Sequence, residues 1–377
     1  MHLRFWASAR TYLTILLVSV LFGCGGSGDT NLTAHVQSEF LYATSQTGIT
    51  GFSVDPTGAL GASFQAASVF TATDALANMV QDPTGRFLFA CGFGNSSIQV
   101  LAVDAKTGIL SPTSSSTLPG FSGCTVDIDQ TGKFLYTATS VGISAFTVSS
   151  TTGALSSIGG SPFFDGIDLR ESAIHPSGKF VYAISNTIGS NTISVFSINS
   201  SSGALTPVAG SPFQMAINGS AYSVVVHPSG KFLYVSFPQS EEIAAWSINT
   251  STGAITVVPG SPFPSGVTSG NAPNSLFVTP SGAFLYALSG GSAVFAFSVD
   301  ANSGTLSAIN GSPLTLSSAT DYFEIDPSGQ FVYAAYANAN TVAGFNINAS
   351  TGTLTPFGAP PVSVSGVTLL SLVKTSQ

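Results

Sequence analysis

An internal repeat that occurs seven times constrains this 377-residue chain more than any other feature of its sequence. A phrase of Phe, an apolar residue and an aromatic residue begins at seven positions that lie 46 to 52 residues apart: Phe40, Phe87, Phe134, Phe180, Phe232, Phe284 and Phe331. A second phrase, Thr or Ser followed by Gly, any residue and Leu or Ile, also occurs seven times in step with the first, at 57, 107, 152, 202, 252, 303 and 351. Periods of roughly 20 to 50 residues are typical of solenoids and propellers.

Each copy of the repeat has the pattern of four short strands. In residues 223–262 the apolar runs SVVV, FLYVS, EIAAWSI and AITVV are separated by HPSGK, FPQSE and NTSTG. Four strands in one repeat of this length match a propeller blade, and the continuous apolar run FLYV is typical of a strand buried on both faces. We therefore predict an all-β fold, a seven-bladed β-propeller of four-stranded antiparallel blades.

The two ends of the chain complement each other. The first copy begins at its second strand, near Phe40, whereas the last apolar run, VTLLSLV, has no second strand after it. We expect residues near 367–374 to pair with residues near 39–45. This pairing would close the ring with one C-terminal innermost strand and three N-terminal strands, and would leave no open sheet edge.

The N-terminus has the pattern of an export signal. MHLRFWASAR is positively charged and is followed by the apolar stretch TYLTILLVSVLFG, which is shorter than the roughly 20 residues that span a bilayer. Residues 21–24, LFGC, resemble the bacterial lipobox, so we predict a lipoprotein signal peptide at 1–23 and acylation of Cys24; the alternative is an ordinary signal peptide with an incidental cysteine. Residues 24–34 would form a flexible tether and 35–377 the propeller, and Gly25 favours an outer-membrane location.

Charge and composition exclude several partners. The formal net charge is −8, only 7% of the residues are charged, and the Lys and Arg residues are scattered singly. A nucleic-acid partner and a direct contact with anionic lipid are therefore not expected, and the membrane would be contacted only through the lipid anchor. No ligand spacing typical of zinc or calcium occurs, so we expect no metal and no cofactor, and we expect a monomer.

One residue of each copy is predicted to lie at a mouth of the central channel. Counting five residues back from the residue that opens each hairpin turn gives Ala77, Cys124, Arg170, Tyr222, Asn274 and Asp321, with Leu370 from the closing strand. Arg170, Glu171 and Asp321 are the candidate catalytic residues, and Asp165, Asp168, Tyr222 and Asn274 are candidates for binding a polar or anionic ligand. The alternative is a solvated ion pair at the rim of the channel.

Two repeated motifs are predicted to be architectural. His175 and His227, in the two copies of HPSGKF, occupy the position that holds Asp or Thr in other copies, so they are expected to cap turns on the face opposite the candidate site. The GSPF motif at 160, 210 and 260 is expected at strand exits. Cys91 and Cys124 lie on the same predicted face, and they either form a disulfide or remain buried free thiols.

The repeats resemble those of the seven-bladed lactonase family, which includes the bacterial 6-phosphogluconolactonases. The likeness rests on HPSGKFLYVS, the later [TS]G.L phrase and GSPF, and it extends over 35–377. It implies a site of Arg, His and Glu side chains at the top of the channel. Arg170 and Glu171 match one such position, but Pro273-Asn274 replaces the Pro-Arg pair of the family, and no His is expected on that face.

Two classes of function follow from these observations. We expect a cell-envelope lipoprotein that binds a small molecule or an envelope protein at the top face, with the catalytic residues of the family mostly absent. The alternative is a lactonase-family hydrolase, 6-phosphogluconolactonase-like, that acts on a sugar lactone or a related carbohydrate derivative at Arg170 and Glu171.

Overall fold

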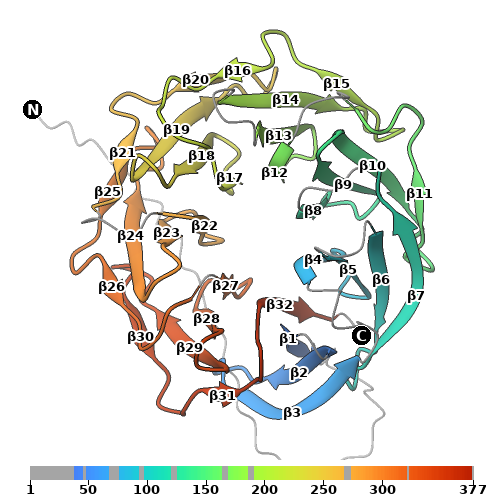
Figure 1. Cartoon of the computed structure of the whole chain (residues 1–377), viewed down its shortest axis with the longest axis vertical. Helices are drawn as coiled ribbons and strands as arrows, with labels where there is room; N and C mark the ends of the chain where they lie inside the picture. Colours follow the sequence, from blue (N-terminus) through green and yellow to red (C-terminus); the bar gives the residue numbers. More distant parts are fainter. Residues whose placement is uncertain are drawn as a thin grey trace, which may run out of the picture. The chain divides into compact units, whose positions relative to one another are not determined.

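Seven antiparallel sheets surround a central axis in the computed structural model (Figure 1). The structure describes residues 38–45, 48–67, 76–92, 97–119, 125–163, 169–185, 191–266, 273–320 and 322–375. The predicted signal peptide, Cys24 and the tether lie outside these ranges. Within them, no helix is long and apolar enough to cross a membrane.

Each sheet is a blade of four strands that follow one another from the channel outward. The blades are β32 (Leu369–Lys374), β1 (Glu39–Ser45), β2 (Gly48–Val54), β3 (Leu60–Ala67); β4 (Leu76–Gln81), β5 (Phe87–Gly92), β6 (Ser97–Val103), β7 (Leu110–Thr117); β8 (Thr125–Ile128), β9 (Phe134–Thr139), β10 (Gly142–Val148), β11 (Leu155–Ser157); β12 (Leu169–Ile174), β13 (Phe180–Ser185), β14 (Thr192–Ile198), β15 (Leu205–Pro207); β17 (Val224–Val226), β18 (Phe232–Phe237), β19 (Glu242–Ile248), β20 (Ile255–Val257); β22 (Ser275–Val278), β23 (Phe284–Leu288), β24 (Ala293–Val299), β25 (Leu306–Ala308); and β27 (Tyr322–Ile325), β28 (Phe331–Tyr336), β29 (Thr341–Ile347), β30 (Leu354–Pro356). The predicted seven-bladed propeller is confirmed.

Four blades carry one additional strand of two residues, which pairs with the third strand of its own blade. These strands are β16 (Phe213–Gln214), β21 (Phe263–Pro264), β26 (Leu314–Thr315) and β31 (Val362–Ser363). The first three of them begin at the last residue of the GSPF motif or of its variant GSPL. The motif's serines, Ser211, Ser261 and Ser312, accept hydrogen bonds from backbone N–H groups of β14, β19 and β24 at 2.8–3.0 Å. The motif is therefore a structural feature of the strand exit, as predicted.

The C-terminal strand closes the ring as expected. β32 pairs antiparallel with β1, and Leu372 lies opposite Leu41. This register corrects the placement of Leu370, which pairs with Ala43 and is fully buried instead of lying at the channel mouth. No hairpin turn follows β32, so the sequence offered no turn from which to count, and Thr368 takes the position expected for Leu370.

The two repeated phrases contact each other across neighbouring blades. The hydroxyl of Tyr234 donates a hydrogen bond to the carbonyl oxygen of Gly304 at 2.9 Å. Gly304 has a φ of +74°, and a Cβ atom there would lie 2.4 Å from the Phe232 ring, so only glycine fits. The same hydrogen bond recurs at 2.7–3.1 Å in six blades: Tyr42 to Gly108, Tyr136 to Gly203, Tyr182 to Gly253, Tyr234 to Gly304, Tyr286 to Gly352 and Tyr333 to Gly58.

The remaining blade, β4 to β7, lacks this hydrogen bond because Phe89 stands where the other blades have Tyr. A Cβ at Gly153 would meet the Phe87 ring at 2.8 Å, as at the other glycines, so the partner position is built in the same way. We expect Phe89→Tyr to add the missing bond and to raise the free energy of unfolding by about 1 kcal/mol. Tyr234→Phe should lower it by a similar amount. Urea denaturation of both variants measures this, and a destabilised Phe89→Tyr would show that the blade has no room for the hydroxyl.

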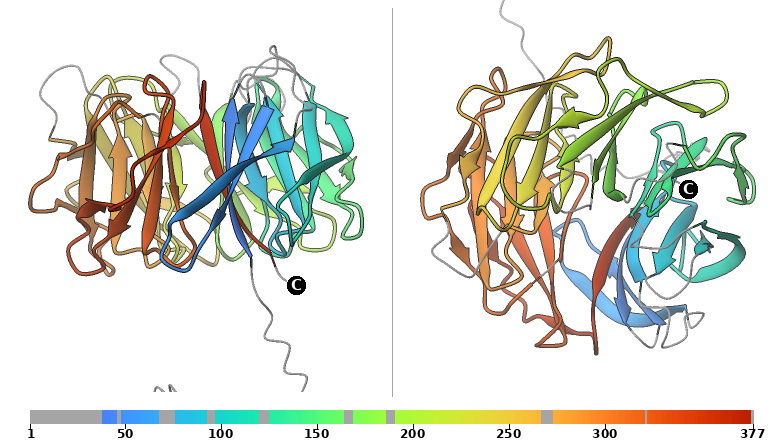
Figure 2. Two further views of the ribbon diagram at one scale, coloured as in Figure 1. Left: turned by 90° about the horizontal axis from the view of Figure 1, so that it is seen from below. Right: turned by 45° about the horizontal axis from the view of Figure 1, so that its top comes forward.

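The histidines of HPSGKF connect blades on the lower face, which we define as the face that carries the hairpins after the innermost strands (Figure 2). Nδ1 of His175 accepts a hydrogen bond from Ser177 N, so Nε2 carries the proton and donates to Gly230 O of the next blade at 2.8 Å. His227 makes the same contacts with Ser229 and Gly282. Both rings are buried, and burial lowers the pKa of His175. Their predicted structural role is confirmed.

Candidate functional site

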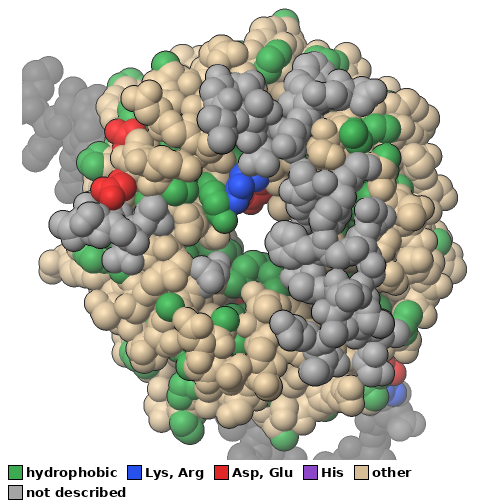
Figure 3. Space-filling model, in the orientation of Figure 1, with side chains coloured by type: hydrophobic (Ala, Val, Ile, Leu, Met, Phe, Trp, Pro, Cys, Tyr) green, Lys and Arg blue, Asp and Glu red, His purple; other side chains and the backbone are tan. Residues whose placement is uncertain are grey.

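The candidate site lies at the upper mouth of the central channel, on the face opposite the HPSGKF hairpins. The innermost strands β4, β8, β12, β17, β22, β27 and β32 surround the channel. In the space-filling view the channel is open at its centre, and a basic side chain with an acidic one beside it lies at its edge (Figure 3). Among the described residues of the innermost strands, Arg170 is the one basic residue apart from Lys374 at the lower end of β32.

A bulge in β12 positions Arg170. Leu169 pairs with Ser185 and Glu171 pairs with Ile184, so Arg170 is an extra residue between two paired ones. Bulges of this kind redirect a side chain out of the regular sheet pattern. The bulge therefore explains why Arg170 can reach across to the neighbouring blade.

Arg170 stacks on Tyr222. The guanidinium carbon lies 3.4 Å from the centroid of the Tyr222 ring, and Nε donates a hydrogen bond to the Tyr222 carbonyl oxygen at 2.9 Å. Tyr222 is 38% exposed, and Arg170 is half-buried. Cation–π contact and hydrogen bond together hold the positive charge at the mouth. The structure thus brings together two residues that were predicted for this site.

Glu171 lies directly below Arg170 along β12. Its Oε2 accepts a hydrogen bond from Val224 N at 3.2 Å, and its Oε1 accepts one from Ser223 Oγ at 3.4 Å. Glu171 as a whole keeps some exposed area, but the surrounding protein removes most of the water from its carboxyl. Burial, and then the negative charge of Asp127, raise the pKa of Glu171 to about 8.

Two further carboxyls of the channel were missed by the sequence analysis. Burial raises the pKa of Asp127 on β8 to about 7, although Ser172 Oγ donates a hydrogen bond to it at 3.1 Å. Burial likewise raises the pKa of Glu324 on β27 to about 8. Both residues lie two positions before the hairpin turn, where most other copies have Val, Ala or Phe. An acidic residue in an otherwise apolar position was the available signal.

Several of these side chains also join neighbouring blades. An innermost strand is the edge of its sheet, and the N–H groups on its unpaired side, next to the channel, need hydrogen-bond partners. Side-chain oxygens of the preceding blade accept them at 3.0–3.3 Å: Asn78 from Val126, Glu171 from Val224, Ser223 from Leu276 and Glu324 from Leu372. Glu171 therefore has a structural contact as well as a place in the candidate site.

The remaining predicted residues are placed as follows. Asn274 is half-buried just before β22, where its backbone bonds with Leu288 and with Ser236, and the described contacts do not join it to Arg170. Cys91 is disulfide-bonded; its pairing with Cys124 remains a prediction. Asp165, Asp168, Asp321 and Cys124 lie outside the described residues.

Metal binding finds no support in the part of the chain that the structure describes. No group of three or more His, Cys, Asp or Glu side chains is arranged there to hold a metal ion.

The fold and the channel mouth together define a β-propeller of a known family. The chain belongs to the seven-bladed β-propeller lactonase family, whose model matches residues 24–164, 164–262 and 214–371. No curated protein sequence matches the chain.

Solved structures share the fold at low sequence identity. A candidate 6-phosphogluconolactonase from Bacteroides uniformis is 19% identical, with a TM-score of 0.73 over 89% of this chain and 99% of that one. A second, from Bacteroides fragilis, is 20% identical, with a TM-score of 0.72 over 92% and 100%. A periplasmic gluconolactonase from Pseudomonas aeruginosa is 16% identical, with a TM-score of 0.70 over 89% and 99%. At these identities the likeness establishes the fold alone.

Proposed function

We propose that this protein is a hydrolase that opens an uncharged sugar lactone at the upper mouth of its channel. The observation that carries the proposal is the bulge in β12, which holds the Arg170 guanidinium over Tyr222, with Glu171 as the next residue of the same strand and its carboxyl close enough to interact with the Arg170 charge. Family membership supports this hydrolase more than the non-catalytic binding module expected from the sequence. The names of the structural neighbours support a lactone as the substrate class.

The chemistry divides between two side chains. Glu171 accepts a proton from a water molecule as that water attacks the lactone carbonyl carbon, and Arg170 stabilises the negative charge that develops on the carbonyl oxygen. The bond between the carbonyl carbon and the ring oxygen then breaks, and the proton passes from Glu171 to the leaving oxygen. The product is the open-chain hydroxy acid. A carboxyl with a pKa of about 8 is close to the value that suits a general base near neutral pH.

The charge of the channel favours an uncharged substrate. In the described residues, Asp127, Glu171 and Glu324 lie on innermost strands around the channel, whose upper mouth carries the single guanidinium of Arg170. A phosphate group would meet one positive charge and several acidic groups, which repel it when they are ionised. A neutral lactone avoids this repulsion.

The leader sequence supports a proposed location in the cell envelope. We infer that Cys24 carries a lipid that holds the protein at the outer membrane, with the propeller as a monomer. Cys24→Ser should then move the protein from the membrane fraction to the soluble fraction. Unchanged recovery in the membrane fraction would contradict the anchor.

Hydrolysis of δ-gluconolactone by the purified protein tests the activity. We expect kcat/KM to rise with pH and to level off above about pH 8, because Glu171 must be ionised to act as the base. Arg170→Ala should lower kcat/KM about 100-fold, and Glu171→Gln about 100-fold or more.

Glu324→Gln is the matched control. The variant removes a carboxyl whose pKa is similar to that of Glu171 and which, like Glu171, accepts a hydrogen bond from a neighbouring innermost strand. Glu324 itself lies away from the channel mouth. The variant should retain the wild-type rate. A protein that turns over none of a panel of sugar lactones, or whose turnover survives in both mouth variants, would leave the proposal without support.

A further inference from the structure

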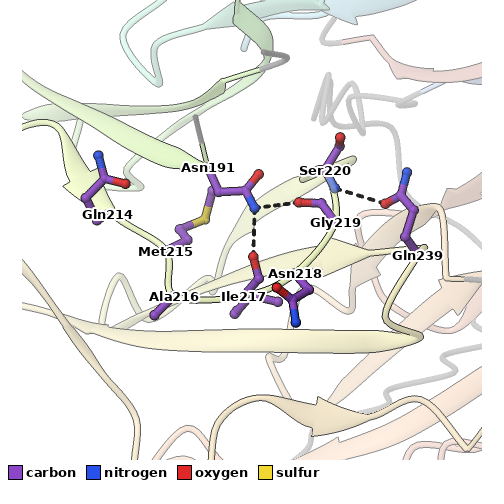
Figure 4. A pocket seen from close by; sticks show the side chains of 9 residues that line it. All are labelled: Asn191, Gln214, Met215, Ala216, Ile217, Asn218, Gly219, Ser220 and Gln239. Carbon is purple, nitrogen blue, oxygen red and sulfur yellow. Dashed lines mark hydrogen bonds between the residues drawn. The ribbon is translucent and has the colours of Figure 1, made fainter. Parts of the chain in front are cut away.

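A pocket lies on the upper face, among connections of the two neighbouring blades β12–β15 and β17–β20 (Figure 4). The loop from Met215 to Ser220, between β16 and β17, forms most of it, and Asn191 and Gln239 border it from the neighbouring strand connections. Its volume of about 630 Å³ lies within the range typical of small-molecule sites. Neither the proposed hydrolysis nor the family membership uses this pocket.

Two amide side chains hold the loop in place. Asn191 Nδ2 donates hydrogen bonds to the carbonyl oxygens of Ile217 and Gly219, and Gln239 Oε1 accepts a hydrogen bond from Ser220 N at 3.0 Å. A primary amide has both a donor and an acceptor end. These contacts use the nitrogen of Asn191 and the oxygen of Gln239, so Asn191 Oδ1 and Gln239 Nε2 are left to face a ligand (Figure 4).

The rest of the lining is uncharged. Gln214 and Asn218 add two exposed amides, while Met215 is 5% exposed and Ile217 is half-buried, so they provide an apolar floor. A charged ligand would lose hydration here without gaining a counter-charge. A sugar hydroxyl both donates and accepts, as an amide does, and the C–H face of a sugar ring suits an apolar floor. We propose that this pocket binds a neutral sugar unit.

The loop that forms the pocket leads along the chain to Tyr222 of the candidate site. Tyr222 follows Ser220 by two residues, which is roughly 7 Å of extended chain, and its carbonyl oxygen accepts the Arg170 Nε hydrogen bond. The sugar site nevertheless stands without the lactone chemistry, because its residues differ from those of the proposed hydrolysis.

Calorimetric titration of the purified protein with maltose, cellobiose and chitobiose tests the proposal, with glucuronate and glucose 6-phosphate as charged probes. We expect at least one neutral disaccharide to bind and both anions to bind at least 10-fold more weakly. Gln239→Glu keeps the oxygen that holds Ser220 but replaces the free donor, so it should weaken binding about 10-fold. Gln214→Ala and Asn218→Ala should each weaken it several-fold.

Gln330→Glu, an exposed amide in a lower-face hairpin, controls for the added charge and should bind as wild type does. The proposal is overturned if no neutral disaccharide binds, if the anions bind as tightly, or if Gln239→Glu binds like the wild type. Because Arg170→Ala removes lactone turnover and not the pocket, binding that persists in that variant separates the two proposals.

Discussion

Deletion of residues 366–377 should leave a protein without a cooperative unfolding transition. The deletion removes β32 together with Val367, and five of the lost side chains are apolar and at most 2% exposed: Val367, Leu369, Leu370, Leu372 and Val373. At about 1.5–3 kcal/mol for each buried side chain, this loss matches the whole stability of a typical domain, roughly 5–15 kcal/mol. It also leaves the inner edge of β1 unpaired. Thermal unfolding followed by circular dichroism measures the effect.

Removal of residues 376 and 377 alone is the control. It keeps Thr375, which is 1% exposed and donates a hydrogen bond to Ser38 O at 3.0 Å. This shorter truncation should melt as the full chain does. A sharp transition near the wild-type temperature after the longer deletion would mean that the ring closes by some other contact.

The fold was predictable because the repeated phrases are themselves the contacts. The Tyr hydroxyl and the Gly carbonyl oxygen that bond neighbouring blades, such as Tyr234 and Gly304, lie in the two phrases that set the period. A contact that recurs in six of the seven copies produces a signal that can be counted in the sequence. The closing strand is made once and has no hairpin after it, so its pairing with residues near 39–45 was predictable, but the position of Leu370 relative to the channel mouth was not.

The site was predicted less completely than the fold. Counting back from the hairpins found Arg170, Glu171 and Tyr222, but the stacking of Arg170 on Tyr222 depends on a bulge that spacing does not reveal. Asp127 and Glu324 were missed because the count considered only the mouth. A residue that departs from the repeat in a single copy, such as Asp127 or Glu324, indicates a candidate site residue in the sequence, and the structure then shows where that residue lies and what it contacts.

The channel carboxyls should make the propeller less stable as the pH rises from about 4.5 to 8. In the folded protein, burial raises the pKa of Asp127 to about 7 and of Glu171 and Glu324 to about 8, whereas in an unfolded chain such groups ionise near pH 4. Between these values the folded state holds protons that the unfolded state has released, so the free energy of unfolding falls with rising pH. Below about pH 4 and above about pH 8 these groups do not change the free energy of unfolding with pH.

The three carboxyls together have a large effect on the free energy of unfolding. A shift of about three pH units corresponds to roughly 4 kcal/mol for one group. The contributions of Asp127 and Glu171 do not simply add, because their charges interact. Other groups act in the opposite direction at the acid end. Hydrogen bonds in their turns lower the pKa of Asp55, Asp104 and Asp300, so their contribution is lost as the pH falls below about 4.

His175 also opposes the carboxyls at acid pH. Burial lowers its pKa, so the unfolded state gains a proton first as the pH falls below about 6.5, and stability is lost there. Together these groups place the stability maximum between about pH 4.5 and 6.5, on the acid side of neutrality. Urea denaturation at half-unit steps from pH 4 to 9 locates it.

Glu324→Gln isolates one channel carboxyl. The amide oxygen can still accept the hydrogen bond from Leu372 N, but no proton is lost as the pH rises. The variant should therefore be more stable than the wild type at pH 8.5, nearly equal to it at pH 4.5, and flatter in between. Glu242→Gln on β19, outside the channel, controls for the loss of a charge and should keep the wild-type slope. A wild-type curve that rises from pH 5 to 8, or a Glu324→Gln curve parallel to it, would mean that these carboxyls are ionised and well hydrated in the folded channel.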